Sequence, residues 1–222
     1  MRKISKTLVA LACLLTIPIV SIFYNFLNNP GNGANVLITG IDRAIPFMKV
    51  FIIPYVSWYF FIFIVLVYLA LKDKNTYYKT LISYNLGMIV CFIVYFVYQT
   101  TVHRPNITGN DILSKLVLLI YSNDNPYNCF PSIHSYTSYL MMKAILKSNV
   151  RNMYNTLIIS SISILIILST LFVKQHVVLD AISAIILGEV IFNIIYKLDL
   201  ESVSQWKEKL FSLLMTKKKL EN

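Results

Sequence analysis

Residues 50–71 read VFIIPYVSWYFFIFIVLVYLAL, a run of 22 residues without a charged side chain. A helix needs about 20 apolar residues to cross the hydrocarbon core of a bilayer, so this run predicts a membrane-spanning helix. The whole chain agrees, because 57% of its 222 residues are apolar, 14% are charged and the mean hydropathy is +0.65. A soluble domain carries roughly 25% charged residues. These values exclude a soluble enzyme, a secreted disulfide scaffold and a disordered region, and they predict an all-α polytopic membrane protein.

Five further runs extend this pattern to a bundle of six transmembrane helices within a single membrane-embedded domain. The fourth run is short and contains Lys143, which lies one turn from the helix end and can extend to the interface. The first run follows a basic segment, as a signal peptide would, but it exceeds the usual apolar core of about 7–15 residues, so we expect a retained helix. The expected helices cover residues 7–27, 50–71, 80–102, 131–147, 152–173 and 176–196.

The distribution of basic residues predicts the orientation of the chain. With the N-terminus in the cytoplasm, 15 of the 20 Lys and Arg residues fall on the cytoplasmic side, including the basic tail at residues 197–222. Because cytoplasmic segments carry an excess of Lys and Arg, we expect both termini in the cytoplasm of a plasma-membrane protein. The net charge of +10 does not indicate nucleic-acid binding, since these residues flank the spans and can contact anionic lipid.

The connection from His103 to Phe130 is the longest outer loop. Its segment Asp111–Tyr121 is apolar but too short to span, so we expect it to lie along the interface or to cap a cavity. The three cysteines have no metal-ligand spacing and predict no disulfide framework.

Polar residues gather at the expected outer ends of four helices, and ionisable groups at such positions are candidates for a functional site. Residues 103–105 (HRP) end the third helix, and residues 131–134 (PSIH) open the fourth. Lys174, His176 and Asp180 lie at the start of the sixth. Helices far apart in sequence are therefore expected to bring two histidines, an arginine and an aspartate to the same depth.

Each of these groups suits phosphate chemistry. Proline favours the first position of a helix, and the free N–H groups of that turn attract an anion. His176 and Asp180 are four residues apart, so the carboxylate can fix the imidazole tautomer and leave the other nitrogen free to attack. Arg104 can bind phosphate oxygens with two N–H groups. A metal site formed by His134, His176 and Asp180 is an alternative interpretation.

Glu189 lies about 13 Å along the sixth helix from Asp180, near the expected middle of the membrane. We expect a structural role for its carboxyl group, either protonated or bonded to Asn193 on the same helix face.

The polar residues resemble the type 2 phosphatidic acid phosphatase superfamily, whose pattern is K-x6-R-P, then P-S-G-H, then S-R-x5-H-x3-D. The resemblance covers residues 97–190, which would form the catalytic core. Arg104 and Pro105 match the first motif, residues 131–134 match the second, and the third is matched by Ser169, His176 and Asp180. The segments NCFPSIHS and KQHVVLDAISAIILG also resemble the branch that contains inositol phosphorylceramide and sphingomyelin synthases.

The resemblance implies phosphoryl transfer without a metal or a cofactor. His176 would attack phosphorus and become a phosphohistidine, and Asp180 would orient it. His134 would protonate the leaving oxygen and then activate water or an acceptor alcohol. The residues expected to hold the phosphoryl oxygens are Arg104, Ser132, Ser169 and Lys174.

Three positions depart from the family pattern. Val97 replaces the lysine, Ile133 replaces the glycine and Thr170 replaces the second arginine. Losing a charge-stabilising donor costs about 3–4 kcal/mol in comparable sites, so a phosphomonoester dianion would be held less well. Either Lys174 replaces a lost charge, or the substrate is a phosphodiester monoanion.

Three functions remain after these observations. The first is a lipid phosphatase that hydrolyses a lipid phosphate or pyrophosphate at the outer membrane face. The second is a phosphotransferase that moves a phospho-headgroup to an acceptor lipid. The third is a non-catalytic lipid binder or transporter that uses the same pocket for recognition.

Overall fold

The computed structural model describes residues 2–31 and 33–198, so most of the basic tail lies outside the described residues. The helices are α1 (Arg2–Ala12), α2 (Thr16–Leu27), α3 (Gly40–Ala44), α4 (Ile52–Lys72), α5 (Lys74–Val97), α6 (Ile112–Asn123), α7 (Ile133–Lys147), α8 (Met153–Phe172) and α9 (Val178–Lys197), with 3-10 turns at Cys13–Leu15 and Lys49–Phe51. The strands β1 (Asn35–Val36) and β2 (Thr100–Thr101) form one short parallel pair between two loops. The prediction of an all-α polytopic membrane protein is confirmed.

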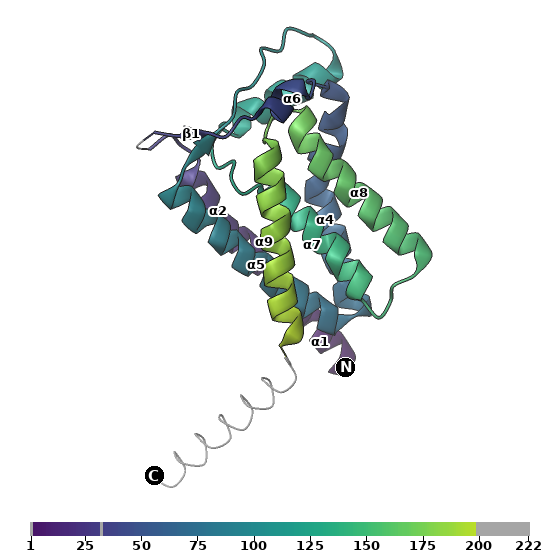
Figure 1. The fold of residues 1–222 in the computed structure, drawn as a ribbon. Helices are drawn as coiled ribbons and strands as arrows, with labels where there is room; N and C mark the ends of the chain where they lie inside the picture. Colours follow the sequence, from purple (N-terminus) through teal and green to yellow (C-terminus); the bar gives the residue numbers. More distant parts are fainter. Residues whose placement is uncertain (1, 32, 199–222) are drawn as a thin grey trace, which may run out of the picture.

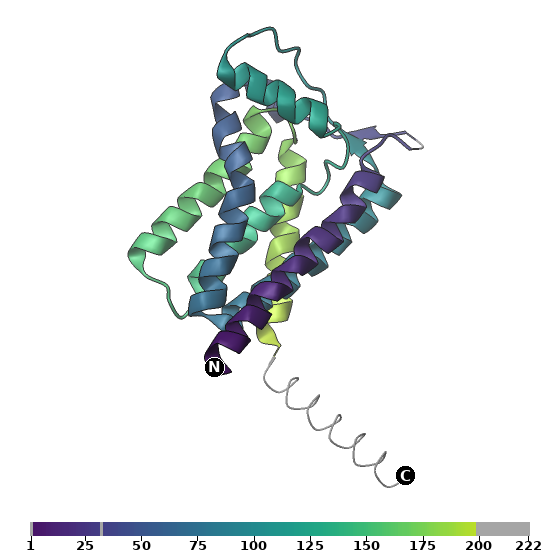
Figure 2. The same ribbon diagram turned by 180° about the vertical axis from the view of Figure 1, so that it is seen from behind.

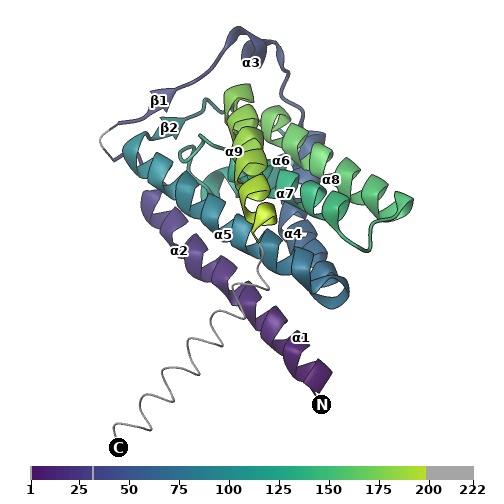
Figure 3. The same cartoon turned by 60° about the horizontal axis from the view of Figure 1, so that its bottom comes forward.

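Five helical segments in the described part of the chain are long and apolar enough to cross a membrane. They are Thr7–Leu27, Lys49–Lys72, Lys74–Val97, Met153–Phe172 and Val178–Lys197. α2 lies along α5 on one side of the bundle (Figure 3).

The remaining predicted span corresponds to α7, which has 15 residues and a length of about 22 Å. α7 packs against α4, α5, α8 and α9, and nine of its 15 residues are buried. Figures 1 and 2, which show opposite sides of the molecule, both place α7 inside the bundle. Because protein surrounds this helix, its sequence needs fewer apolar residues than that of a lipid-facing span.

α5 covers Lys74–Val97, whereas the uncharged run predicted a helix over residues 80–102. The helix begins early because the Asp73 side chain caps it, accepting a hydrogen bond from the backbone N–H of Thr76. Lys79 lies inside the helix, where its Nζ donates to the backbone carbonyl of Tyr196 at 3.0 Å. A charged side chain with a partner does not end a helix, and the uncharged run therefore marked the boundary six residues late.

The ends of the helices bring the predicted site residues to one end of the bundle. The C-terminal ends of α5 and α8 meet the N-terminal ends of α7 and α9 at one end of the bundle, and α6 lies across this end (Figures 1 and 2). α6 contacts α4 and the turn before it. This position agrees with the expectation that the segment Asp111–Tyr121 lies along the interface or caps a cavity.

Glu189 of α9 is bonded to α7 as well as to its own helix. Its carboxylate accepts hydrogen bonds from Asn193, Tyr139 and Lys143, with Lys143 Nζ 2.9 Å from Oε2. The expected contact with Asn193 is confirmed. The lysine that interrupts the fourth run thus pairs with the glutamate that interrupts the sixth, and the pair joins two helices of the bundle.

Gly87 allows α5 to approach α7 closely. The ring of Tyr136 lies over this glycine, and its hydroxyl donates to the Ser83 carbonyl at 2.6 Å. A Cβ atom at position 87 would lie 2.0 Å from the Tyr136 ring. We expect Gly87→Ala to lower the free energy of unfolding by about 1–3 kcal/mol, because overpacking outweighs the better helix propensity of alanine. Thermal unfolding in detergent measures the effect, and Gly40→Ala, which meets no atom within 4 Å, is the control. If the melting temperature were unchanged in both variants, the close packing of the Tyr136 ring on Gly87 would be contradicted.

Candidate active site

The PSIH segment is fixed between α5 and α9. Ser132 caps α7, with its side chain accepting from the Ser135 N–H at 3.3 Å, and its own N–H donates to the Asp180 carbonyl at 3.1 Å. On the opposite side, the Tyr95 hydroxyl donates to the Pro131 carbonyl at 2.6 Å. These backbone contacts bring the second and third sequence motifs together, and they position the first turn of α7 beside α9.

His176 lies in the turn between α8 and α9, two residues before α9 begins. The backbone N–H groups of Gln175 and His176 both donate to the Thr170 carbonyl, at 3.0 and 3.1 Å. Lys174 has a φ of 55°, in the left-handed region, which allows the chain to reverse here. The sequence placed His176 inside the helix, but the structure presents it from a tight turn.

The ring of His176 is oriented by two oxygen atoms. Nδ1 is 3.0 Å from the Cys129 carbonyl and 3.4 Å from Asp180 Oδ2. A carbonyl oxygen can only accept a hydrogen bond, so Nδ1 carries the proton and Nε2 keeps its lone pair. Asp180 is itself held by the Val177 N–H, which donates to Oδ2 at 2.9 Å. The Asp180 contact was predicted from the sequence, whereas the shorter contact to Cys129 was not.

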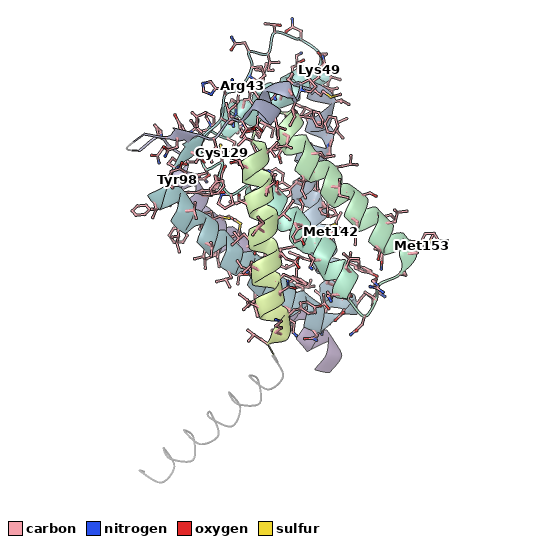
Figure 4. All side chains as sticks on the ribbon, in the orientation of Figure 1. Arg43, Lys49, Tyr98, Cys129, Met142 and Met153 are labelled. Atoms are coloured by element: carbon pink, nitrogen blue, oxygen red, sulfur yellow. The ribbon has the colours of Figure 1, made fainter. Side chains whose placement is uncertain are left out.

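No sequence motif would have identified Cys129 as a site residue, because it contacts His176 through its backbone carbonyl. It lies in the loop before α7, at the same end of the bundle as Arg43 and Lys49 (Figure 4). Its side chain, His176 and Asp180 have potential metal-ligand atoms within 4.8 Å of one another. His134 does not belong to this group, so among the described residues the alternative metal site of His134, His176 and Asp180 is not assembled.

His134 lies close to His176 and is held by aromatic rings. The centroids of the two imidazoles are 5.9 Å apart. His134 packs on Tyr55 at 4.6 Å and on Trp58 at 4.3 Å, and Trp58 is fixed by a 2.8 Å hydrogen bond to Thr137. Within the described residues, His134 Nε2 is buried without a hydrogen-bond partner. This nitrogen is therefore free for proton transfer.

Two cavities adjoin His176. One has a volume of about 280 Å³ and is lined by His134, His176, Asp124 and several aromatic side chains. The other has about 160 Å³ and is lined by Arg43, His103 and Lys174. A larger apolar groove of about 740 Å³ lies between α4 and α8 and contains none of the predicted site residues. The two histidines thus share the 280 Å³ cavity.

Asp124 is a residue of this cavity that the sequence did not single out. Its Oδ1 accepts hydrogen bonds from the Tyr24 hydroxyl and from Asn28 Nδ2, both at 2.8 Å. Burial raises the pKa of Asp124, against the opposing effects of the Tyr24 hydrogen bond and the charges of Arg104 and His176. Asp124 follows α6 in an Asn-rich loop without a recognisable motif. The contacts to Tyr24 and Asn28 join α2 and the residue that follows it to the site.

Arg104 lies beside the site and contacts three oxygen atoms. Nη1 donates to the carbonyls of Tyr121 and Asp124, at 3.2 and 2.7 Å, and Nη2 donates to Gln175 Oε1. Its Nε is buried without a partner in the described part of the chain. Arg104 therefore links the long loop to the residue that precedes His176. Phosphate binding by Arg104, for which Nε is the available donor, stays a prediction.

Ser169 and Lys174 contact backbone carbonyls. Ser169 Oγ donates to Ile166 within α8 at 2.6 Å, and Lys174 Nζ donates to Asp42 and Ile45 at 3.1 and 2.5 Å. Burial lowers the pKa of Lys174, although Asp42 acts in the opposite direction. Lys174 lines the smaller cavity together with His176. The predicted roles of Ser169 and Lys174 in phosphate binding are not tested by these contacts.

The positions that lack the family's cations have distinct environments. Val97 is the last residue of α5 and is 76% exposed. Thr170 is buried, and its hydroxyl donates to the Ile167 carbonyl at 2.7 Å. Neither side chain lines the cavity that contains the histidines.

Comparison with known proteins gives one match. The sequence model of the PAP2 superfamily matches residues 79–203, a range that contains Arg104, both histidines and Asp180. No curated protein and no solved structure matches. The match confirms the predicted superfamily without supporting the branch of the sphingomyelin synthases. Because it spans more than half of the chain, the protein belongs to the PAP2 superfamily, whose members are phosphatases and phosphotransferases.

Proposed function

We propose that the protein is a lipid phosphatase that hydrolyses a phosphate ester or pyrophosphate through a phosphohistidine on His176. The observation that carries this proposal is the pair of imidazoles, 5.9 Å apart at one cavity, with the Nδ1 proton of His176 directed to an oxygen. One nitrogen of each ring is then available to act on the same phosphoryl group.

In the first step, Nε2 of His176 attacks phosphorus, and the bond from phosphorus to the leaving oxygen breaks. Protonated His134 gives its proton to that oxygen. Asp180 and the Cys129 carbonyl stabilise the positive charge on the His176 ring through Nδ1. In the second step, water attacks phosphorus and gives a proton to His134, and the N–P bond breaks to release phosphate. The enzyme returns to its starting protonation state.

The phosphoryl oxygens would bind at the first turn of α7, which offers free backbone N–H groups and the positive end of the helix dipole. Ser132 and Arg104, which the sequence motifs predict to bind phosphate, are the side chains proposed to contact these oxygens. Phosphoryl transfer depends mainly on positioning and charge stabilisation, so this set of groups is sufficient without a metal or a cofactor.

The proposed substrate is a lipid, because the cavity lies at the end of an apolar bundle. The distribution of basic residues supports an orientation with both termini in the cytoplasm, and the proposed location is the plasma membrane. The N-terminal ends of α7 and α9, which carry or adjoin the two histidines, lie at the end of the bundle opposite the turn between α4 and α5, which Lys72 and Lys74 flank (Figure 1). This arrangement supports an active site on the exoplasmic face.

Trapping the intermediate tests the proposal. The purified protein is incubated with a ³²P-labelled lipid monoester, diester or pyrophosphate in EDTA and quenched at alkaline pH, where phosphohistidine survives. We expect label on His176 and none on the His176→Asn variant. If none of the three substrate classes labels the wild-type protein, the proposal is wrong.

Headgroup transfer is a second candidate function. It is favoured by the absence of cations at positions 97 and 170, since a phosphodiester monoanion needs less charge compensation than a monoester dianion. Supplying labelled lipid with and without a lipid alcohol separates the two functions. A water-soluble labelled product, which is free phosphate from a monoester or the phosphorylated headgroup from a diester, supports hydrolysis, and a new labelled lipid supports transfer.

A further inference from the structure

The cavity that contains both histidines has an acidic wall. Asp124 lines it, and among the described residues this carboxylate forms no ion pair. Arg104 contacts Asp124 only through the backbone carbonyl, and the side-chain partners of Asp124 are the neutral groups of Tyr24 and Asn28. The cavity therefore includes a carboxylate that no cation pairs with directly among the described residues, although the nearby charge of Arg104 acts on it through space.

Aromatic rings accompany this carboxylate. Tyr24, Trp58 and Tyr59 line the same cavity, and the rings of Trp58 and Tyr59 meet edge to face at 4.8 Å. Aromatic faces attract alkylammonium groups, most strongly where water is excluded, and a carboxylate adds direct charge attraction. We call Asp124, Tyr24, Trp58 and Tyr59 the acidic recess.

A phosphomonoester dianion would be repelled by this recess. A zwitterionic phosphodiester would place one negative charge at the histidines and one positive charge beside Asp124. Such a substrate also needs fewer cations around phosphorus, which agrees with Val97 and Thr170. A bound cation would further oppose the effect of burial on the Asp124 carboxylate.

We propose that the acidic recess binds the alkylammonium group of a zwitterionic phosphodiester lipid while its phosphate lies between His134 and His176. The recess part of this proposal stands on the cavity alone, and the position of the phosphate rests on the proposed function. The substrate class is thus a phospholipid with a choline-like or ethanolamine-like headgroup.

The binding test uses Trp58 as a reporter and does not depend on turnover. The chain has two tryptophans, so Trp206→Phe leaves Trp58 as the single tryptophan. Phosphocholine, tetramethylammonium and glycerol 3-phosphate are titrated separately into the detergent-solubilised protein. We expect saturable fluorescence changes with the two ammonium compounds, and affinity at least about tenfold lower for glycerol 3-phosphate, a 1.4 kcal/mol difference.

The variants separate recognition from folding. Asp124→Asn keeps the acceptor for Tyr24 and Asn28 but removes the charge, and we expect at least about tenfold weaker binding of tetramethylammonium. Asp111→Asn removes the same charge from an exposed residue outside the cavity, and its binding should equal that of the parent protein. Unchanged tetramethylammonium binding in Asp124→Asn, or no saturable binding in the parent protein, would overturn the proposal.

Turnover distinguishes this proposal from the proposed function. Wild-type protein should consume phosphatidylcholine or phosphatidylethanolamine with a higher kcat/KM than phosphatidic acid, and Asp124→Asn should reduce that preference. Ammonium binding without turnover of any lipid would leave the recess established and the phosphatase proposal wrong. A preference for phosphatidic acid that is equal in both proteins would overturn the ammonium proposal and leave the phosphatase intact.

Discussion

His176→Ala is expected to lower the rate of phosphoryl transfer by a factor on the order of 10³ or more, about 4 kcal/mol in the activation barrier. The variant lacks the nitrogen that would form the bond to phosphorus, and no other imidazole among the described residues approaches Asp180 and the Cys129 carbonyl. Release of phosphate or diacylglycerol from labelled lipid in detergent micelles measures the loss. The residual rate reports binding and electrostatic stabilisation without the covalent step.

Two controls accompany this variant. His103→Ala removes an exposed imidazole that lines the smaller cavity but not the one that His134 and His176 share, and it should retain a rate close to that of the wild type. His176→Asn keeps a donor that can reach the Cys129 carbonyl, and its melting temperature shows whether the turn still folds. If folded His176→Ala turned over lipid at the wild-type rate, the cavity would serve recognition or transport, and both enzymatic functions would be excluded.

The sequence predicted correctly that candidate side chains at fixed spacings would lie close together. His134, His176 and Asp180 were identified from two short motifs, and the charge pattern placed these motifs at one end of the bundle. The structure brings all three together, with His176 in the turn before α9, Asp180 in the first turn of α9 and His134 in the first turn of α7. The length needed to cross a membrane is a strong constraint, so the long helices could be located without coordinates, although both ends of α5 were predicted several residues away from their true positions.

The contacts made by loops could not be predicted in this way. The Cys129 carbonyl that orients His176 has no sequence signature, because every residue carries a carbonyl group. Asp124 reaches the cavity from a connection without periodicity, and Lys174 turns toward Asp42 and Ile45 because its backbone is left-handed. These contacts depend on how the loops fold over the bundle, which local spacing does not encode.

The short central helix shows a second limit of sequence reasoning. Hydropathy identifies helices that face lipid, whereas α7 contacts protein on most sides and carries Ser135, Thr137 and Ser138 as buried residues. The family motif located this helix more reliably than its hydropathy. Burial within protein therefore permits the polar composition of α7.

His134→Gln is expected to lower lipid turnover by about 10²–10⁴-fold, the usual contribution of a general acid or base. The leaving group of a lipid ester is an alkoxide, which must be protonated as its bond to phosphorus breaks. An aryl phosphate with a nitrophenolate leaving group needs no such proton. The first step should therefore be much less affected with the aryl substrate than with the lipid.

The second step still requires His134, because water must lose a proton as it attacks the phosphohistidine. With the aryl substrate, His134→Gln should give a burst of nitrophenol close to one equivalent per protein, followed by slow turnover and a phosphohistidine that persists. Rapid-quench measurements of nitrophenol and of labelled protein would record both phases. Glutamine fills much of the space between Tyr55 and Trp58, so the packing around position 134 should survive the substitution. An equal loss of the first step with lipid and aryl substrates would show that His134 holds the substrate and does not transfer the proton.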